Sequence, residues 1–177
     1  ALCSYPDVQE KVFQDVLNHC PSTNDVNKNK VMLDLETIEQ MVYFNAFMQE
    51  VLRMLPPIGM ISRATTQDET FGTPYTVPKG TRITIPIYLL HRHPQYWEDP
   101  ELFQPERWIF SNDKDREAFM SQIKFAFLPF SWGARNCIGQ RFAVIEAHMI
   151  MAELIRNFRF EIAPSQRNTK FTISNLV

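Results

Sequence analysis

Proline is concentrated in the middle of this chain, and its distribution limits where helices can form. The chain contains 12 prolines against only 5 glycines, and eight of the prolines lie between Pro56 and Pro105. Proline has no backbone N–H to donate and disfavours helix in the residue before it. The sequence therefore predicts helical segments at both ends of the chain, joined by a long irregular middle.

Apolar residues recur at helical spacing in the first part of the chain. A helix start signal at Pro6 precedes a stripe with spacing i, i+4, i+8 and i+9. The members of this stripe are Val8, Val12, Val16 and Leu17. A second helical pattern runs over residues 44–55 and stops at the Pro56-Pro57 pair. The polar residues 21–30 between the two patterns are predicted to form a loop.

Beyond the proline pair the periodicity changes from helix to strand. Residues 81–87 alternate between apolar and polar, which is typical of a half-buried strand, and the segments around Ile61 and Tyr75 are weaker strand candidates. Residues 78–80, Pro-Lys-Gly, are a turn signal. A loop rich in aromatics and prolines follows at residues 91–108. Its two histidines, His91 and His93, are interpreted as ordinary loop residues and not as metal ligands.

The last third of the chain returns to a helical pattern that ends near Asn157, followed by a strand-like tail at residues 158–163. We assign the apolar stripe of this helix to core packing. The stripe consists of Ile138, Phe142, Ile145, Met149 and Ala152.

Composition excludes several classes of protein. Hydrophobic residues make up 45% and charged residues 21% of the 177 residues, which is typical of a globular chain with a core. A net charge of −2 gives no overall attraction for nucleic acid. The sequence has no uncharged apolar run long enough to span a bilayer, and its first ten residues lack signal-peptide features. The three cysteines, Cys3, Cys20 and Cys137, suit neither a disulfide framework nor a zinc site.

One segment places a cysteine in a distinctive chemical setting. In the sequence FSWGARNCIG, residues 130–139, Cys137 lies between two glycines and directly before the long predicted helix. The unpaired N–H groups and positive dipole end of a helix start favour a thiolate, and Arg135 adds a nearby cation. On these residues alone, a buried structural cysteine on a turn stays open as the simpler interpretation.

The same segment resembles the haem-binding signature of the cytochrome P450 family, Phe-x-x-Gly-x-Arg-x-Cys-x-Gly, at all five fixed positions. The resemblance implies that Cys137 is the axial thiolate ligand of haem b (iron protoporphyrin IX), and so both the catalytic and the metal-binding residue. It also implies that Phe130 and Gly139 contact the haem, and that Arg135 binds a haem propionate. Arg63 lies where family members often place another propionate-binding cation; a surface strand arginine is the alternative.

Two further motifs resemble the family and keep its order. Glu50-Val51-Leu52-Arg53 is similar to the Glu-x-x-Arg helix, and residues 105–108, Pro-Glu-Arg-Trp, are similar to its Pro-Glu-Arg-Phe segment. The resemblance implies that Glu50, Arg53 and Arg107 form a structural network beneath the haem. Spacing alone does not single out the first pair, because Glu153 and Arg156 have the same i, i+3 spacing.

The resemblance covers the whole chain and implies a mainly α fold with a small β portion, the C-terminal, haem-proximal part of the cytochrome P450 fold. Residues 1–177 are then a partial domain. The distal helix, the N-terminal half and any membrane anchor are expected to lie outside it, because family members are more than twice this length.

The implied function is that of a haem-thiolate monooxygenase, an oxidoreductase that inserts one oxygen atom of O2 into a lipophilic organic substrate. Residues 58–62 resemble a substrate-lining segment. The implied electron source is NADPH through NADPH–cytochrome P450 reductase, with cytochrome b5 as a further candidate. Lys124, Arg135 and Arg141 lie around the cysteine loop, where the family binds its electron donor, or form an ordinary solvated patch. The implied location is the cytosolic face of the endoplasmic reticulum membrane.

Three alternatives stay open at this point. The first is a reductase-independent family member that rearranges peroxides or dehydrates its substrate. The second is a truncated fragment that is inactive by itself and binds haem poorly. The third, a hydrolase with a cysteine nucleophile, ranks last because neither a base nor an oxyanion site can be identified.

Overall fold

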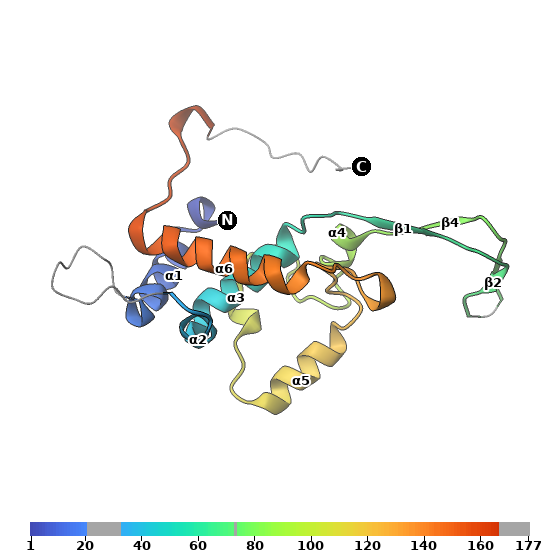
Figure 1. Ribbon diagram of the computed structural model, residues 1–177, viewed down its shortest axis with the longest axis horizontal. Helices are drawn as coiled ribbons and strands as arrows, with labels where there is room; N and C mark the ends of the chain where they lie inside the picture. The colour runs from blue at the N-terminus through green and yellow to red at the C-terminus, as the bar shows by residue number, and fades with distance from the viewer. Residues whose placement is uncertain (21–32, 73, 167–177) are drawn as a thin grey trace.

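The computed structural model describes residues 1–20, 33–72 and 74–166 and is dominated by helices (Figure 1). The strands form two small antiparallel sheets. The predicted fold class, mainly α with a small β portion, is therefore confirmed. In this described part, no helix combines the length and the apolar character needed to cross a membrane. The loop predicted at residues 21–30 lies outside the described residues.

Four helices form the packed centre of the molecule (Figure 1). They are α1 (Pro6–His19), α2 (Leu35–Gln40), α3 (Val42–Met54) and α6 (Gln140–Asn157), and each packs against the other three. A short 3-10 turn, η1 (Leu2–Ser4), precedes α1. Burial of apolar side chains holds the four helices together. The core that they share includes Val12, Val16, Ile38, Met41, Phe44, Phe47, Ala152 and Ile155.

The first and third helices form where the sequence predicts them. Proline occupies the first position of α1, where its missing N–H has no intrahelical partner to lose. Helix α3 ends at Met54, just before the proline pair. At its other end, the Asp15 carboxylate of α1 accepts a hydrogen bond from the Phe44 N–H at 2.9 Å. This bond satisfies one free N–H of the first turn and fixes α3 against α1.

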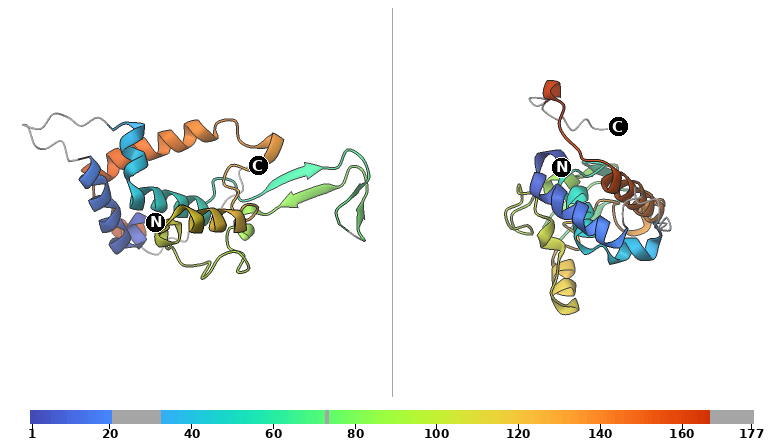
Figure 2. Two further views of the ribbon diagram at one scale, coloured as in Figure 1. Left: turned by 90° about the horizontal axis from the view of Figure 1, so that it is seen from below. Right: turned by 90° about the vertical axis from the view of Figure 1, so that its left-hand side faces the viewer.

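The strands form a narrow ribbon that extends away from the helices (Figure 2). Strand β1 (Ile61–Ala64) pairs antiparallel with β4 (Arg82–Ile85), and β2 (Glu69–Thr70) pairs with β3 (Thr76–Val77). The predicted strands around residues 61 and 75 are therefore confirmed. The strand predicted at residues 81–87 is confirmed only for Arg82–Ile85, because Pro86 ends it and α4 begins at Ile87. Gly80 has a φ of +82° at the predicted turn, a conformation that only glycine adopts without strain.

The long segment between α4 (Ile87–Leu90) and α5 (Asp113–Gln122) packs on its own aromatic side chains. It contains one 3-10 turn, η2 (Pro105–Trp108). Trp97 is buried, and its ring centroid lies 5.7 Å from that of Trp108. Figure 1 shows α5 projecting away from the four-helix centre. Aromatic packing therefore gives this irregular segment a core of its own.

Two predictions for the last third are wrong. In the predicted stripe, Ala152 is buried, but Ile138, which precedes α6, is exposed. Phe142 and Met149 of α6 are exposed as well, because the packed helices cover only part of the surface of α6. Residues 158–163 belong to no strand of the described structure. Instead the Gln9 side chain bonds the backbone of Phe160, accepting from its N–H at 2.7 Å and donating to its C=O at 3.0 Å.

Two further 3-10 turns, η3 (Gly133–Arg135) and η4 (Pro164–Gln166), complete the described elements.

Candidate functional site

A buried charge network lies at the C-terminal half of α3. Glu50 and Arg53 are both fully buried and lie on one helix face, because residues three apart are neighbours. Arg53 Nε donates to Glu50 Oε2 and Arg53 Nη2 donates to Glu50 Oε1, each at 2.8 Å. Two parallel bonds between a guanidinium and a carboxylate are the strongest geometry for such a pair.

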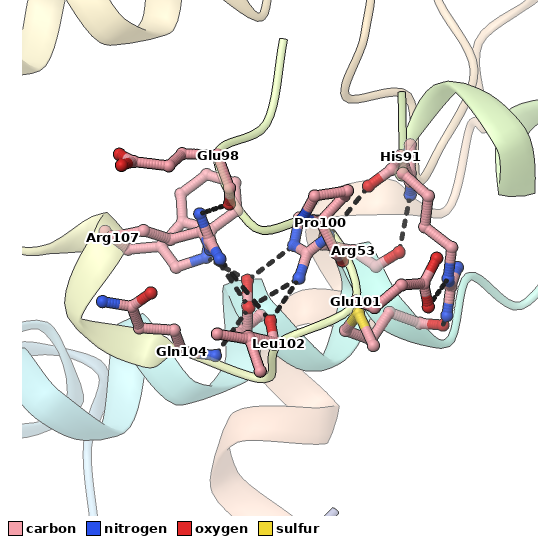
Figure 3. Close-up of polar contacts among 12 residues, drawn as sticks. Arg53, His91, Glu98, Pro100, Glu101, Leu102, Gln104 and Arg107 are labelled. Carbon is pink, nitrogen blue, oxygen red and sulfur yellow. Dashed lines mark hydrogen bonds and ion pairs between the residues drawn. The ribbon is translucent and has the colours of Figure 1, made fainter. Parts of the chain in front are cut away.

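Three more donors reach the same carboxylate from the segment around η2. Arg107 Nε donates to Oε1 at 3.1 Å, and the Gln104 N–H donates to Oε1 at 2.8 Å. Trp108 Nε1 donates to Oε2 at 2.9 Å. Arg53 and Arg107, labelled in Figure 3, both form ion pairs with this carboxylate. The predicted network residues Glu50, Arg53 and Arg107 are thus in direct contact.

Two opposing effects determine the protonation of Glu50. Burial alone raises the pKa of this carboxyl group, but the hydrogen bonds and the charge of Arg53 lower it by more. Bonds from the Gln104 N–H and the Trp108 indole lower it further. The pKa of Glu50 therefore lies below its ordinary value, so the group is a carboxylate at neutral pH.

The remaining donors of Arg53 hold the loop that follows α4. Arg53 Nη1 donates to the C=O groups of His91, at 3.0 Å, and Pro100, at 2.7 Å. Arg53 Nη2 donates to the Leu102 C=O at 2.9 Å (Figure 3). The guanidinium carbon also lies 5.2 Å from the centre of the Trp97 ring. The Glu50–Arg53 pair therefore has no exposed surface and directs its hydrogen bonds to other protein groups.

The cysteine loop lies between α5 and α6 in the chain, and backbone bonds define its shape. The Cys137 N–H donates to the Phe130 C=O at 2.9 Å, and the Asn136 N–H donates to the Gly133 C=O at 3.1 Å. Gly133 adopts a φ of +76°, which lets the chain reverse there. A Cβ atom on Gly139 would lie 3.9 Å from Cys137 Sγ. Cys137, Phe130 and Gly139 are therefore held close together by the loop itself.

The thiol of Cys137 is exposed, unlike that of a structural core cysteine. Apolar side chains beside it are exposed as well: Ile138 fully, Phe142 to 70% and Trp132 to 58%. A groove of about 580 Å³ between α2 and α6 reaches Cys137 and Ile138. A second groove, lined by Phe130, lies toward α3. An exposed thiol set among uncovered apolar side chains is a surface suited to a bound ligand.

The two arginines assigned to propionates are exposed and separate from the buried network. Arg135 ends η3 within the cysteine loop, and Arg63 lies on β1. Neither makes an ion pair within the described part of the chain, and Arg63 Nη1 bonds only the neighbouring Ser62 C=O at 2.8 Å. Exposed cations and an exposed thiol among apolar side chains fit an apolar macrocycle with two carboxylates, which is the chemistry of haem.

Two residues of the network were missed by sequence reasoning. Trp108 stands where the family motif has Phe, and its indole N–H, a donor that Phe lacks, was the available signal. His91 was interpreted as a loop histidine, but it is fully buried and hydrogen-bonded through both ring nitrogens. Sequence gave no sign of that burial, because the contacts of His91 come from segments 37 and 38 residues away.

Comparison with known proteins points to a single family. The family model described as "Cytochrome P450" matches residues 1–177. The chain is 35% identical over 176 residues to "Probable cytochrome P450 313a4" of Drosophila melanogaster, covering 99% of this chain and 32% of that protein. It is 34% identical over 173 residues to "Secologanin synthase 2" of Catharanthus roseus, covering 97% and 30%. It is 34% identical over 161 residues to "Cytochrome P450 3A28" of Bos taurus, covering 90% and 29%. The chain thus spans about a third of the length of these curated relatives.

Proposed function

The chain belongs to the cytochrome P450 family, and from this premise we propose that it is part of a haem-thiolate monooxygenase with Cys137 as the axial ligand. The proposed reaction is RH + O2 + NADPH + H⁺ → ROH + H2O + NADP⁺. One oxygen atom enters a C–H bond of the substrate and the other leaves as water, while NADPH is oxidised. Residues 1–177 are proposed to be the haem-proximal, C-terminal part of the catalytic domain.

The exposed thiol of Cys137 is the observation that carries this proposal. Haem bound there supplies an iron centre for O2 activation, and a thiolate ligand favours O–O cleavage. The bond from the Cys137 N–H to the Phe130 C=O fixes the backbone from which the sulfur projects. The exposed side chains of Ile138 and Phe142 provide the apolar surface that a macrocycle needs, and they exclude water from the sulfur when covered.

The arginines and the buried network have distinct proposed roles. Arg135 and Arg63 are proposed to bind the two haem propionates, because each is exposed and has no acidic partner in the described structure. Glu50, Arg53 and Arg107 are proposed to hold the proximal side in shape without taking part in the chemistry. Haem b is the proposed form of the cofactor.

The surfaces around the site support the proposed substrate class and partners. Ile58 and Met60 are exposed in the segment after α3, which supports a lipophilic organic substrate. Lys124 Nζ lies 5.3 Å and 5.6 Å from the ring centres of Phe125 and Trp132, next to the cysteine loop. This cation and Arg135 support docking of an acidic electron donor, proposed to be NADPH–cytochrome P450 reductase or cytochrome b5. The proposed location is the cytosolic face of the endoplasmic reticulum membrane.

The test is spectroscopic and uses the full-length protein. Its ferrous carbonyl form should show the strongly red-shifted Soret band of thiolate ligation, and the Cys137→Ala variant should lose that band. Substrate oxidation should then require O2, NADPH and the reductase. Survival of the band in the variant would overturn the ligand assignment. Turnover of a hydroperoxide without NADPH, and none with it, would favour a reductase-independent reaction.

A further inference from the structure

His91 lies between the charge network and the segment that leads into the cysteine loop. It follows α4 and has no exposed surface. Its ring centroid lies 5.1 Å from that of Phe127. On its other side, Arg53 binds it through the backbone, donating from Nη1 to the His91 C=O at 3.0 Å (Figure 3). His91 therefore contacts both the charge network, through its C=O, and the segment before the cysteine loop, through its ring.

Both ring nitrogens of His91 have partners, and these partners allow one neutral form of the ring. The Leu128 N–H donates to Nε2 at 2.8 Å, so Nε2 carries a lone pair and no proton. The proton must then lie on Nδ1, which donates to the Arg53 C=O at 3.1 Å. A proton on Nε2 would place the ring N–H against the Leu128 N–H, so that two donors would face each other with no acceptor. The neutral Nδ1–H tautomer is thus the only form that satisfies both contacts.

The bond to Leu128 continues toward Cys137 through the backbone. The Leu128 C=O accepts a bond from the Ser131 N–H at 3.1 Å, which closes a turn in which Ser131 has a φ of +65°. Next to that turn, the Phe130 C=O accepts the bond from the Cys137 N–H at 2.9 Å. Three successive hydrogen bonds therefore join the imidazole to the residue that bears the thiol.

We propose that His91 is a positioning residue for Cys137: its imidazole ties the end of α3 to Leu128 and so fixes the loop from which the thiol projects. This inference rests on the proposed function, in which Cys137 ligates haem iron. His91 also connects the Glu50–Arg53 pair to the cysteine loop, because the Arg53 side chain binds the His91 C=O and the Arg53 C=O binds the His91 ring.

Two charged side chains and one aromatic ring surround the imidazole. Arg53 faces it from α3, Arg92 follows it in the chain, and the Phe127 ring packs on it. Both charges are positive, so they disfavour a second proton on the ring and support the neutral tautomer. No acidic group is among the neighbours that affect this histidine in the described structure.

The test compares His91→Gln with His91→Asn in the full-length, haem-loaded protein. The Gln carbonyl oxygen can reach the position of Nε2 and accept the Leu128 bond. The shorter Asn amide reaches only the position of Nδ1 and can keep the bond to the Arg53 C=O. The first readout is the ratio of the red-shifted thiolate band to the unshifted band in the ferrous carbonyl spectrum, taken per folded, haem-loaded molecule. The second is hydrogen exchange of the Leu128 amide.

In His91→Asn, we expect the fraction of molecules without thiolate ligation to rise about fivefold, the factor that loss of one buried hydrogen bond gives. His91→Gln should stay close to the wild type. Leu128 should exchange faster in the Asn variant than in the Gln variant. Equal band ratios in the two variants, or equal Leu128 exchange, would overturn the inference.

The two proposals fail in different ways. If the wild type itself shows no thiolate band, the proposed function fails. If the wild type shows the band and the Asn variant matches the Gln variant, only the positioning role fails. A general loss of stability lowers haem content in both variants alike but leaves the band ratio of the loaded molecules unchanged.

Discussion

Replacing Glu50 with glutamine tests whether the buried network stabilises the fold. The change keeps the shape of the side chain but removes its charge and puts an NH2 group in place of one oxygen. At Oε2, the position with fewer donors, that group would face Arg53 Nε and the Trp108 indole N–H. Two donor–donor contacts replace two hydrogen bonds, and the charges of Arg53 and Arg107 lose their carboxylate.

The expected loss of unfolding free energy is large. Removing one partner of a buried ion pair costs about 3–5 kcal/mol, because the remaining charge stays in a medium of low dielectric constant. Whole-domain stability is about 5–15 kcal/mol, so this loss is a substantial part of the total. The pair is fully buried, so solvent screening does not reduce the loss.

The assay is urea denaturation of the full-length protein, followed by tryptophan fluorescence. With a slope of about 3 kcal/mol per molar urea, the midpoint should fall by about 1 M or more. Glu153→Gln is the matched control. Glu153 has the same spacing to the buried Arg156, but the Glu153 side chain is itself 51% exposed, so water reaches this pair and its loss should be clearly smaller than that of Glu50→Gln. Equal losses of unfolding free energy in Glu50→Gln and Glu153→Gln would refute the claim that burial of Glu50 makes its loss large.

Three further predictions concern single side chains. Trp108→Phe keeps the ring packing but removes one donor to Glu50, and should cost about 1–3 kcal/mol in urea denaturation; no measurable loss would contradict this. Burial lowers the pKa of His91 to about 4, below its ordinary 6.5. Because the unfolded chain binds this proton first, stability should fall between pH 6.5 and pH 4, by up to about 1.4 kcal/mol per pH unit, and His91→Gln should fall less steeply. Cys137→Ala should change the unfolding free energy of the apoprotein by less than about 0.5 kcal/mol, because the thiol is exposed, and a larger loss would indicate a buried structural cysteine.

Helices and strands were the most predictable features of the fold. The stripe with Val12 and Val16, the stop before Pro56 and the alternation at residues 82–85 are all local, since neighbours in sequence determine them. Failures occurred where partners come from elsewhere. The apolar stripe of α6 has a helical period, but nothing in that period shows which part of the helix the other elements cover.

The residues of the candidate site also fall into those that local sequence predicts and those that depend on distant contacts. Cys137 with its loop, and Glu50 with Arg53, were predicted from motifs that resemble the family, because each set lies within one short segment. Arg107 was linked to them only through the family resemblance, since it is 57 residues away from its partner carboxylate. Trp108 and His91 were missed, because their roles depend on where their ring nitrogens point after the loop has folded onto α3.

The sequence by itself determined α1, α3, α6 and the strand segments, the cysteine loop and the candidate pairs of charges, but not α4 or α5. It could not distinguish two Glu-x-x-Arg pairs of identical spacing. Only the tertiary structure decided that Glu50 is fully buried with five donors around it, while Glu153 is half exposed. The physical reason is that a charge becomes a structural element only when distant parts of the chain exclude water from it and supply its hydrogen bonds.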